Sequence, residues 1–253
     1  MEYEKMNRRE ALKTMGLFAL GSGLAMTSLG AEENVQNQNK AGKKMKVMLV
    51  NGSPHKEGCT FTALTEIAET LRKNGVDSEF FWIGRKPVSG CIACRACAKT
   101  GRCIIDDAVN RFLDRVPEFD GFVFGAPVHF ASPNGMTISF MDRVFFCDFN
   151  KGKHFAGKPG AAIASCRRAG SSATLDVLNK YFVFSKMPLV PSQYWPMVHG
   201  GVAEDVKKDI EGLQIMRTLG QNMAWLLKCI AAGKAAGIDL PQYEPFTPTN
   251  FIR

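Results

Sequence analysis

Short apolar segments alternate with longer amphipathic ones along most of this chain. The apolar segments are rich in β-branched and aromatic residues and end at Gly, Pro, Asn or Ser, which predicts strands over 46–50, 79–83, 121–125, 160–165 and 188–190. The other segments repeat apolar residues every three or four positions, which predicts helices over 61–71, 109–116, 138–146, 172–184 and 204–236. Strands that alternate with helices in this way predict an α/β fold, with a parallel sheet covered by helices on both faces.

The N-terminal residues 1–31 have the pattern of a targeting signal. Arg8 and Arg9 precede an apolar run over 15–29, which is too short and too rich in glycine for a membrane span of about 20 residues. The arginine pair resembles the twin-arginine export signal, although Ala11 stands where that signal often has an aromatic residue. The resemblance implies export of the folded protein to the periplasm, and an uncleaved anchor that faces outward is the alternative. A cytoplasmic location is less favoured.

The remaining chain divides into a linker and one large domain. Residues 32–44 are polar and predict a structureless linker, so the folded domain is expected over 45–253. The chain has 253 residues, of which 45% are hydrophobic and 22% charged, as is usual for a globular protein. Its formal net charge is +8, but the basic residues are scattered, which argues against nucleic acid as a partner. The excess of positive charge is consistent with an anionic cofactor or with a merely basic surface.

Three loops follow predicted strands at the edge of the sheet where such folds bind ligands. Parallel sheets bind ligands at the carboxyl ends of their strands, which directs attention to the loops over 52–60, 126–135 and 165–171. The first loop joins a strand to a helix and is rich in small and hydroxyl residues, which favours phosphate binding. It matches neither a Walker loop nor the G-x-G-x-x-G pattern. Taken alone, it is equally consistent with a tight turn that caps a helix.

Together the three loops resemble the NADPH-dependent FMN reductase and iron–sulfur flavoprotein group of the flavodoxin-like superfamily. The first loop resembles the group's phosphate loop. The second resembles its Pro-Val-Tyr-Phe/Trp isoalloxazine loop, followed by the Asp-Arg pair that appears here as Asp142-Arg143. The resemblance runs from residue 45 to the end of the chain. It implies a three-layer sandwich with a five-stranded parallel sheet in the order 2-1-3-4-5, tightly bound FMN, and a homodimer or higher homo-oligomer.

The resemblance also implies which residues surround the flavin, with the isoalloxazine ring between the second and third loops. The implied cofactor-binding residues are Ser53, His55, Cys59, Thr60, Pro127, Val128, His129, Phe130, Cys166, Arg167, Arg168 and Gly170.

Several of these residues depart from the family pattern or have open roles. His55 stands where the family often has Arg, Cys59 where it often has Asn, and His129 where it usually has Tyr. His129 either tunes the flavin or simply packs as part of the wall. Arg168, or its neighbour Arg167, either stabilises negative charge on the reduced flavin or is a solvated loop residue.

Four of the eight cysteines fall in one short stretch. Cys91, Cys94, Cys97 and Cys103 have the spacing C-x2-C-x2-C-x5-C. Four thiolates this close suit a [4Fe–4S] cluster, and the spacing resembles the compact motif of iron–sulfur flavoproteins. Free thiols or disulfides, and a four-thiolate zinc site, remain alternatives.

These features lead to one main functional hypothesis and two alternatives. The main hypothesis is an FMN-dependent oxidoreductase that takes a hydride from NAD(P)H and passes electrons to a quinone, a soluble flavin or an electron-transfer protein. The first alternative is an electron carrier that relays single electrons between protein partners, which export favours because NAD(P)H is scarce outside the cytoplasm. The second is a flavin-less metal-binding module. No Ser-His-Asp arrangement or carboxylate pair indicates hydrolysis.

Overall fold

The parallel sheet has the predicted order, and four of its five predicted strands are present. The structure, a computed structural model, describes residues 44–251. Its sheet runs β2-β1-β3-β5-β6, and each neighbouring pair on this path is parallel. A short sixth strand, β4, pairs antiparallel with the end of β3 and forms part of the second loop. The strands are β1 (Lys46–Asn51), β2 (Asp77–Trp82), β3 (Gly121–His129), β4 (Ser132–Pro133), β5 (Gly160–Cys166) and β6 (Met197–His199).

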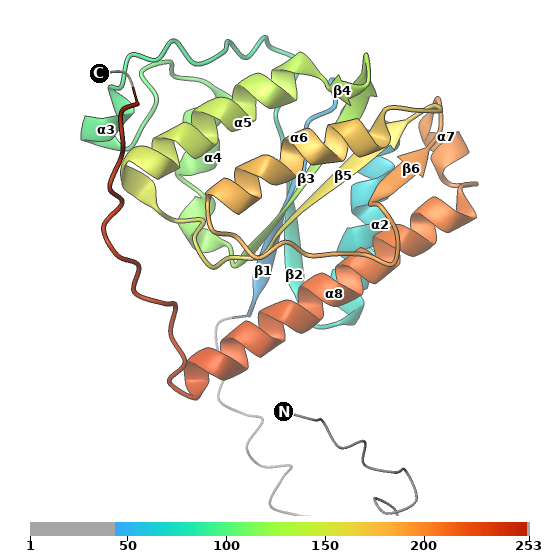
Figure 1. Cartoon of the computed structure of the whole chain (residues 1–253). Helices are drawn as coiled ribbons and strands as arrows, with labels where there is room; N and C mark the ends of the chain where they lie inside the picture. Colours follow the sequence, from blue (N-terminus) through green and yellow to red (C-terminus); the bar gives the residue numbers. More distant parts are fainter. Residues whose placement is uncertain (1–43, 252–253) are drawn as a thin grey trace, which may run out of the picture. The chain divides into compact units, whose positions relative to one another are not determined.

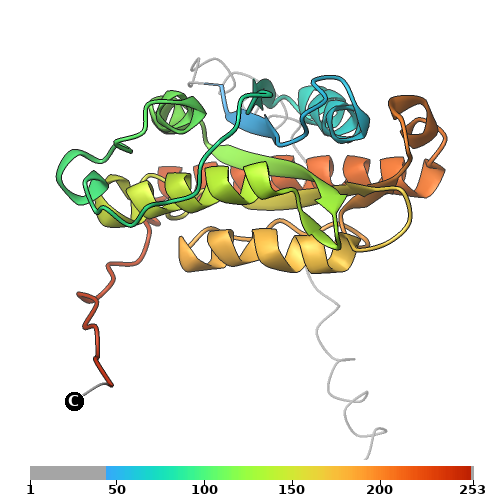
Figure 2. The ribbon, with the colours of Figure 1, turned by 90° about the horizontal axis from the view of Figure 1, so that it is seen from above.

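Helices cover both faces of this sheet (Figures 1 and 2). Helices α4, α5 and α6 share one buried cluster with the sheet, whereas α2 and α8 share the other. The three-layer arrangement expected of the flavodoxin-like fold is therefore confirmed. The helices are α2 (Cys59–Lys73), α3 (Cys97–Thr100), α4 (Ala108–Leu113), η2 (Val116–Glu118), α5 (Gly135–Cys147), η3 (Asp148–Gly152), α6 (Ser171–Phe184), α7 (Ala203–Val206) and α8 (Ile210–Ala235).

The last strand was predicted in the wrong place. The segment 188–190 forms only one isolated parallel bridge, between Leu189 and Gly160, and the regular ladder to β5 comes later, at β6. Pro188 and Pro191 border that bridge, and proline has no backbone N–H with which to extend a ladder.

The predicted long helical region over 204–236 is two helices, α7 and α8, because Asp209 caps the second one. One carboxylate oxygen of Asp209 accepts a hydrogen bond from the backbone N–H of Gly212 at 2.9 Å, which begins α8. The other accepts from the backbone N–H of His199 at 2.6 Å and fixes α8 to the end of β6. A side chain that caps a helix in this way interrupts the helix before it.

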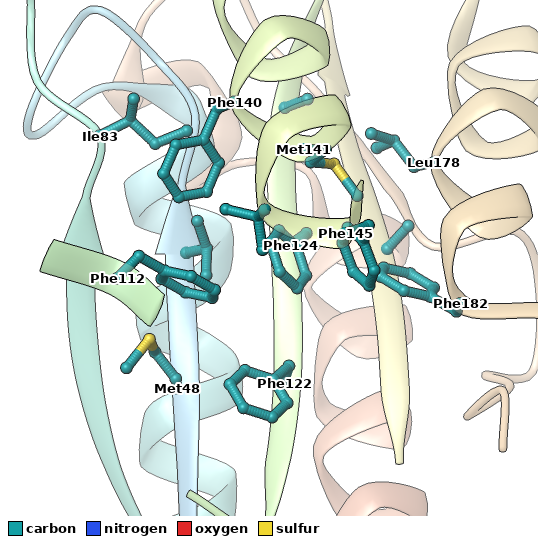
Figure 3. Close-up of a cluster of buried hydrophobic side chains, with 14 of the residues drawn as sticks. Met48, Ile83, Phe112, Phe122, Phe124, Phe140, Met141, Phe145, Leu178 and Phe182 are labelled. Carbon is teal, nitrogen blue, oxygen red and sulfur yellow. The ribbon is translucent and has the colours of Figure 1, made fainter. Parts of the chain in front are cut away.

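A core of phenylalanines holds α5 against the sheet (Figure 3). Phe112 of α4 packs edge-on against Phe140 of α5, with ring centroids 5.2 Å apart, and Phe145 stacks on Phe155 at 4.7 Å. Burying each such ring contributes about 1.5–3 kcal/mol, and aromatic pairing adds to it. This packing fixes α5, which begins at the end of the second loop and contacts α3 in the cysteine loop, residues 91–103.

Two predictions concern residues that lie mostly outside the described part of the chain. The predicted signal, residues 1–31, and the predicted linker up to residue 43 are not described. No helix within residues 44–251 is both long and apolar enough to cross a membrane.

Candidate functional site

The first and second loops are joined at Gly52. Its backbone N–H donates to the carbonyl of Gly125 at 2.8 Å. Its carbonyl accepts from the Asn134 amide at 3.0 Å and the Thr137 hydroxyl at 3.1 Å, both at the start of α5. A Cβ at Gly52 would lie 2.1 Å from the Thr137 hydroxyl oxygen, so a larger residue would break this junction.

The first and third loops are joined by two buried hydroxyls. Thr60, in the first turn of α2, and Ser165, near the end of β5, share a hydrogen bond of 2.8 Å. The Ser53 hydroxyl likewise accepts from the backbone N–H of His55 at 3.1 Å. The family resemblance implies that the hydroxyls of Ser53 and Thr60 contact the phosphate, and both already have protein partners. A hydroxyl has one donor and two acceptor positions, so each keeps capacity for a ligand.

The second and third loops meet at Gly170. This residue has φ +88°, and a Cβ on it would lie 2.6 Å from the Cα of Ala131. Across from it, Phe130 and Ala131 have φ of 50° and 58°, a left-handed conformation that non-glycine residues seldom adopt. Backbone strain of this kind concentrates at binding and catalytic sites. The three loops predicted to surround one ligand are thus connected pairwise at the carboxyl edge of the sheet.

The N-terminus of α2 has the features of an anion site. Within residues 44–251, no side chain caps this helix at Gly58, and its first turn carries no acidic residue. A hollow of about 510 Å³ opens beside it, bordered by the first loop, Arg85 and residues 201–204. Its basic side chains are His55, Lys56 and Arg85, and its carboxylates are Glu57 and Glu204. Free backbone N–H groups at the positive end of a helix suit a phosphate.

The side chains implied to surround the flavin ring differ in exposure. Four of them are exposed on the second and third loops and are called the flavin rim below: His129, Phe130, Arg167 and Arg168. Phe130 is fully exposed. Pro127 and Val128 are half-buried. The rim therefore offers one imidazole, one phenyl ring and two guanidinium groups to a ligand, and none of the four is part of the core.

The two cysteines among the implied flavin residues are shielded thiols. Cys166 is 6% exposed, and burial raises the pKa of its thiol. Cys59 is half-buried, its sulfur lies 3.6 Å from the carbonyl of Gly200, and burial likewise raises the pKa of its thiol. Both are therefore suited to packing beside a ligand and not to acting as thiolates.

The four clustered cysteines line one narrow pocket. Cys97 is buried and Cys103 half-buried, whereas Cys91 and Cys94 are exposed. Three isoleucines, Phe146, Arg95, the fully buried Arg143 and a fifth cysteine complete the lining. The fifth is Cys147, a buried residue at the end of α5.

The donors in this pocket fit an anionic iron–sulfur group. Arg143 donates from Nε and Nη2 to the sulfur of Cys103, at 3.2 Å each. The Asn150 amide lies 3.6 Å from the sulfur of Cys97. N–H groups directed at cysteine sulfurs are a recurrent feature around iron–sulfur clusters. Among the described residues, no group of three or more Cys, His, Asp or Glu side chains is positioned to hold a metal ion.

Sequence reasoning missed the contacts that fix the loops. Trp82 donates from Nε1 to the carbonyl of Ser53 at 2.8 Å, and so holds the first loop from β2. Its position at the end of a strand beside β1 was a usable signal. Arg143 appeared only as part of a family motif, because nothing in the local pattern indicates that this charged side chain is buried.

Comparisons with known proteins identify the family. The sequence profile of the NADPH-dependent FMN reductase family matches residues 45–201. An iron–sulfur flavoprotein of Methanocaldococcus jannaschii is 30% identical over 193 residues, which are 74% of this chain and 99% of that protein. An iron–sulfur flavoprotein of Methanosarcina thermophila is 24% identical over 191 residues, 74% of this chain and 97% of the relative.

Solved structures show the same fold at low sequence identity. RosB with a bound formylriboflavin phosphate intermediate has a TM-score of 0.58 at 13% identity and covers 83% of this chain and 94% of its own. FerB of Paracoccus denitrificans, a flavoenzyme NAD(P)H:(acceptor) oxidoreductase, has a TM-score of 0.53 at 15% identity. The match covers 74% of this chain and 98% of FerB. Taken with the profile match and the connected loops, these comparisons show that the chain belongs to the NADPH-dependent FMN reductase family and is an FMN-dependent oxidoreductase on a flavodoxin-like fold.

Proposed function

We propose that this chain oxidises NAD(P)H with FMN bound at the carboxyl edge of the sheet, and passes the electrons to a quinone, a soluble flavin or an electron-transfer protein. The observation that carries the proposal is the pairwise connection of the three loops through Gly52, the Thr60–Ser165 pair and Gly170. When bound, FMN supplies the redox chemistry, and the protein supplies position and electrostatics.

At the phosphate end, the chain's own groups bind and orient. The uncapped first turn of α2 offers backbone N–H groups to the phosphate, and the helix dipole favours its negative charge. Trp82 and Arg85 hold the first loop by donating to the carbonyls of Ser53 and Pro54, at 2.8 and 3.2 Å. Such fixed donors reduce the ordering cost of binding.

At the ring end, the exposed rim residues have the chemistry to tune a flavin. Arg167 and Arg168 bring positive charge to the third loop, which would stabilise an anionic reduced flavin or a nicotinamide phosphate. His129 offers an exposed imidazole that can donate or accept a hydrogen bond. Their roles are proposals that rest on their exposure at the loop junction.

In the cysteine loop, we propose a [4Fe–4S] cluster held by Cys91, Cys94, Cys97 and Cys103. The support is their common pocket, the guanidinium donors at Cys103, and relatives that are named iron–sulfur flavoproteins. Such a cluster would supply one-electron transfer in addition to the two-electron chemistry of the flavin.

A second candidate function, the electron carrier, has one observation in its favour. The rim of the cysteine pocket is exposed and partly apolar: Cys91 and Cys94 are exposed, and Ile92 and Ile104 are 65% and 64% exposed. An apolar rim around a redox group suits transient docking of a protein partner. Export through the signal at Arg8 and Arg9, which we also propose, would favour such a partner over NAD(P)H as the donor.

We further propose that the chain is a homodimer or higher homo-oligomer. An apolar hollow of about 500 Å³ lies between α5 and α6, and its exposed rings include Phe149 and Phe184. The family resemblance implies a homo-oligomer, and we propose that a second copy of this chain covers this hollow. Analytical sedimentation of the FMN-loaded protein measures its oligomeric state, and a monomer at micromolar concentration would contradict the proposal.

The deciding experiment is an absorption spectrum of the anaerobically purified protein without residues 1–31, with flavin, iron and zinc analysis of the same sample. We expect flavin bands, a broad iron–sulfur shoulder and about four irons per chain. Anaerobic NADH or NADPH is then added, and bleaching of the flavin bands supports the reductase. Bleaching only by dithionite supports the carrier, and absence of flavin after incubation with FMN overturns both.

A further inference from the structure

Arg143 is a fully buried cation whose donors all have partners. It lies on α5 and is 1% exposed. A buried charge is tolerated only when it is paired and hydrogen-bonded. Besides the two bonds to the Cys103 sulfur, the guanidinium donates to both carboxylate oxygens of Asp107 at 2.6 and 3.1 Å, to the carbonyl of Ile105 at 2.9 Å and to that of Ser89 at 3.4 Å.

These partners lie at both ends of the cysteine loop. Ser89 comes two residues before Cys91, the first cysteine, and Cys103 is the last. Ile105 comes two residues after Cys103, and Asp107 caps α4 by accepting from the backbone N–H of Val109 at 3.0 Å. One side chain on α5 therefore ties the beginning of the loop to its end.

Cys103 is the most firmly held of the four cysteines. Its backbone N–H donates to the Asn110 side chain at 2.9 Å, and its carbonyl accepts from the same amide at 2.9 Å. Arg143 then fixes its sulfur. By contrast, Cys91 and Cys94 are exposed, and the residues on either side of Cys94, Ala93 and Arg95, have positive φ angles.

We propose that Arg143 is a positioning residue that pre-forms the cysteine loop for its cluster and sets the cluster's reduction potential. The inference rests on the proposed [4Fe–4S] cluster. The planar fork of an arginine can bind a sulfur, a carboxylate and a carbonyl together, which a lysine ammonium cannot do with the same geometry. Its positive charge, buried beside a ligating sulfur, stabilises the more negative reduced cluster and so raises the potential.

The first test uses the protein with FMN but without cluster, so it does not depend on cluster loading. Hydrogen exchange is measured over residues 89–105 in the wild type and in Arg143→Gln and Arg143→Lys. We expect the amide of Cys103 to exchange at least tenfold faster in both variants. The control is Arg111→Gln, which removes one exposed arginine from α4 and should leave exchange unchanged. Unchanged exchange in both Arg143 variants would overturn the positioning role.

The second test is the potential of the reconstituted cluster. At a fixed applied potential, Arg143→Gln should lower the ratio of reduced to oxidised cluster at least tenfold. For one electron, a tenfold change corresponds to a reduction potential lower by about 59 mV. Arg143→Lys should lower it less, because the charge remains, and Arg111→Gln should leave it unchanged. Equal shifts in all three variants would overturn a specific role of Arg143.

The two tests separate this inference from the proposed function. If the wild type takes up no iron, the cluster proposal fails, while hydrogen exchange still decides whether Arg143 holds the loop. If Arg143→Gln does not fold, as judged by loss of FMN and of cooperative unfolding, Arg143→Lys decides by the same exchange measurement.

Discussion

A side chain on Gly170 would place its Cβ 2.6 Å from the Cα of Ala131, so the second and third loops meet at a contact that only glycine permits. The same Cβ would lie 2.8 Å from a methyl group of Val128. The positive φ of Gly170 adds a conformational reason for glycine. Because the flavin ring is proposed to lie between these loops, this contact sets how closely they approach each other.

We therefore expect Gly170→Ala to reduce both stability and FMN affinity. The left-handed backbone costs about 1–2 kcal/mol for a residue with a Cβ, and overpacking adds about 1–3 kcal/mol. Urea unfolding and FMN titration measure the two effects. The matched control is Gly135→Ala at the start of α5, where a Cβ would meet nothing within 4 Å. Similar losses in both variants would show that the contact with Ala131 is not the cause.

A second prediction concerns the hydrogen bond between Thr60 and Ser165. Thr60→Val and Ser165→Ala should each reduce the free energy of unfolding by about 1–3 kcal/mol, because each leaves the other buried hydroxyl without its hydrogen-bond partner. The double variant should lose less than the sum of the two. Additive losses in this double-mutant cycle would contradict a direct interaction.

The same variants test the phosphate contact that the family resemblance assigns to Thr60. If its hydroxyl also binds the phosphate, Thr60→Val should weaken FMN binding about tenfold, or 1.4 kcal/mol, beyond the effect of Ser165→Ala. Quenching of flavin fluorescence gives both dissociation constants. Equal weakening would assign Thr60 to holding the loops together and not to direct binding.

The sequence was sufficient to predict those parts of the fold that depend on local patterns. The strands that became β1, β3 and β5 are almost wholly apolar, and their burial confirms that reading. β6 was missed because only three residues form it, whereas the apolar Leu189 between two prolines resembled a strand more strongly. A weak edge strand depends on its neighbour β5 more than on its own composition.

The candidate site was predictable in position but not in its internal contacts. The three loops followed from the rule that ligands bind at the carboxyl ends of parallel strands, and the cysteine loop followed from its spacing. The hydrogen bonds between Arg143 and Cys103 join residues 40 positions apart, and those between Thr60 and Ser165 join residues 105 apart. Such pairings depend on tertiary packing, which no local sequence pattern specifies.

A third prediction concerns the reactivity of Cys166. Burial raises the pKa of its thiol, so the thiolate fraction is small at any pH below that raised value. We expect iodoacetamide to modify Cys166 at least tenfold more slowly at pH 8 than Cys229, which is exposed on α8. Mass spectrometry of peptides from the folded protein measures both rates. Equal rates would mean that the third loop opens readily.

The same shift has a consequence for stability. The unfolded chain releases the Cys166 proton at a lower pH than the folded protein, so the free energy of unfolding should fall as pH rises from the ordinary thiol pKa to the raised one. Cys166→Ala removes this group, and its stability should depend less on pH in that interval. An unchanged pH dependence in the variant would contradict the assignment to Cys166.

The last prediction uses two cysteines of one pocket to test the ligand assignment. Cys97 and Cys147 are 6% and 2% exposed and line the same pocket, but only Cys97 belongs to the C-x2-C-x2-C-x5-C spacing. Cys97→Ser should therefore lower iron from about four per chain to less than one, whereas Cys147→Ser should retain it. Iron analysis and the flavin content of the same samples distinguish cluster loss from unfolding. Loss of iron in Cys147→Ser with FMN retained would make Cys147 a ligand, and the cluster would then depend on the position of α5 and not on the loop alone.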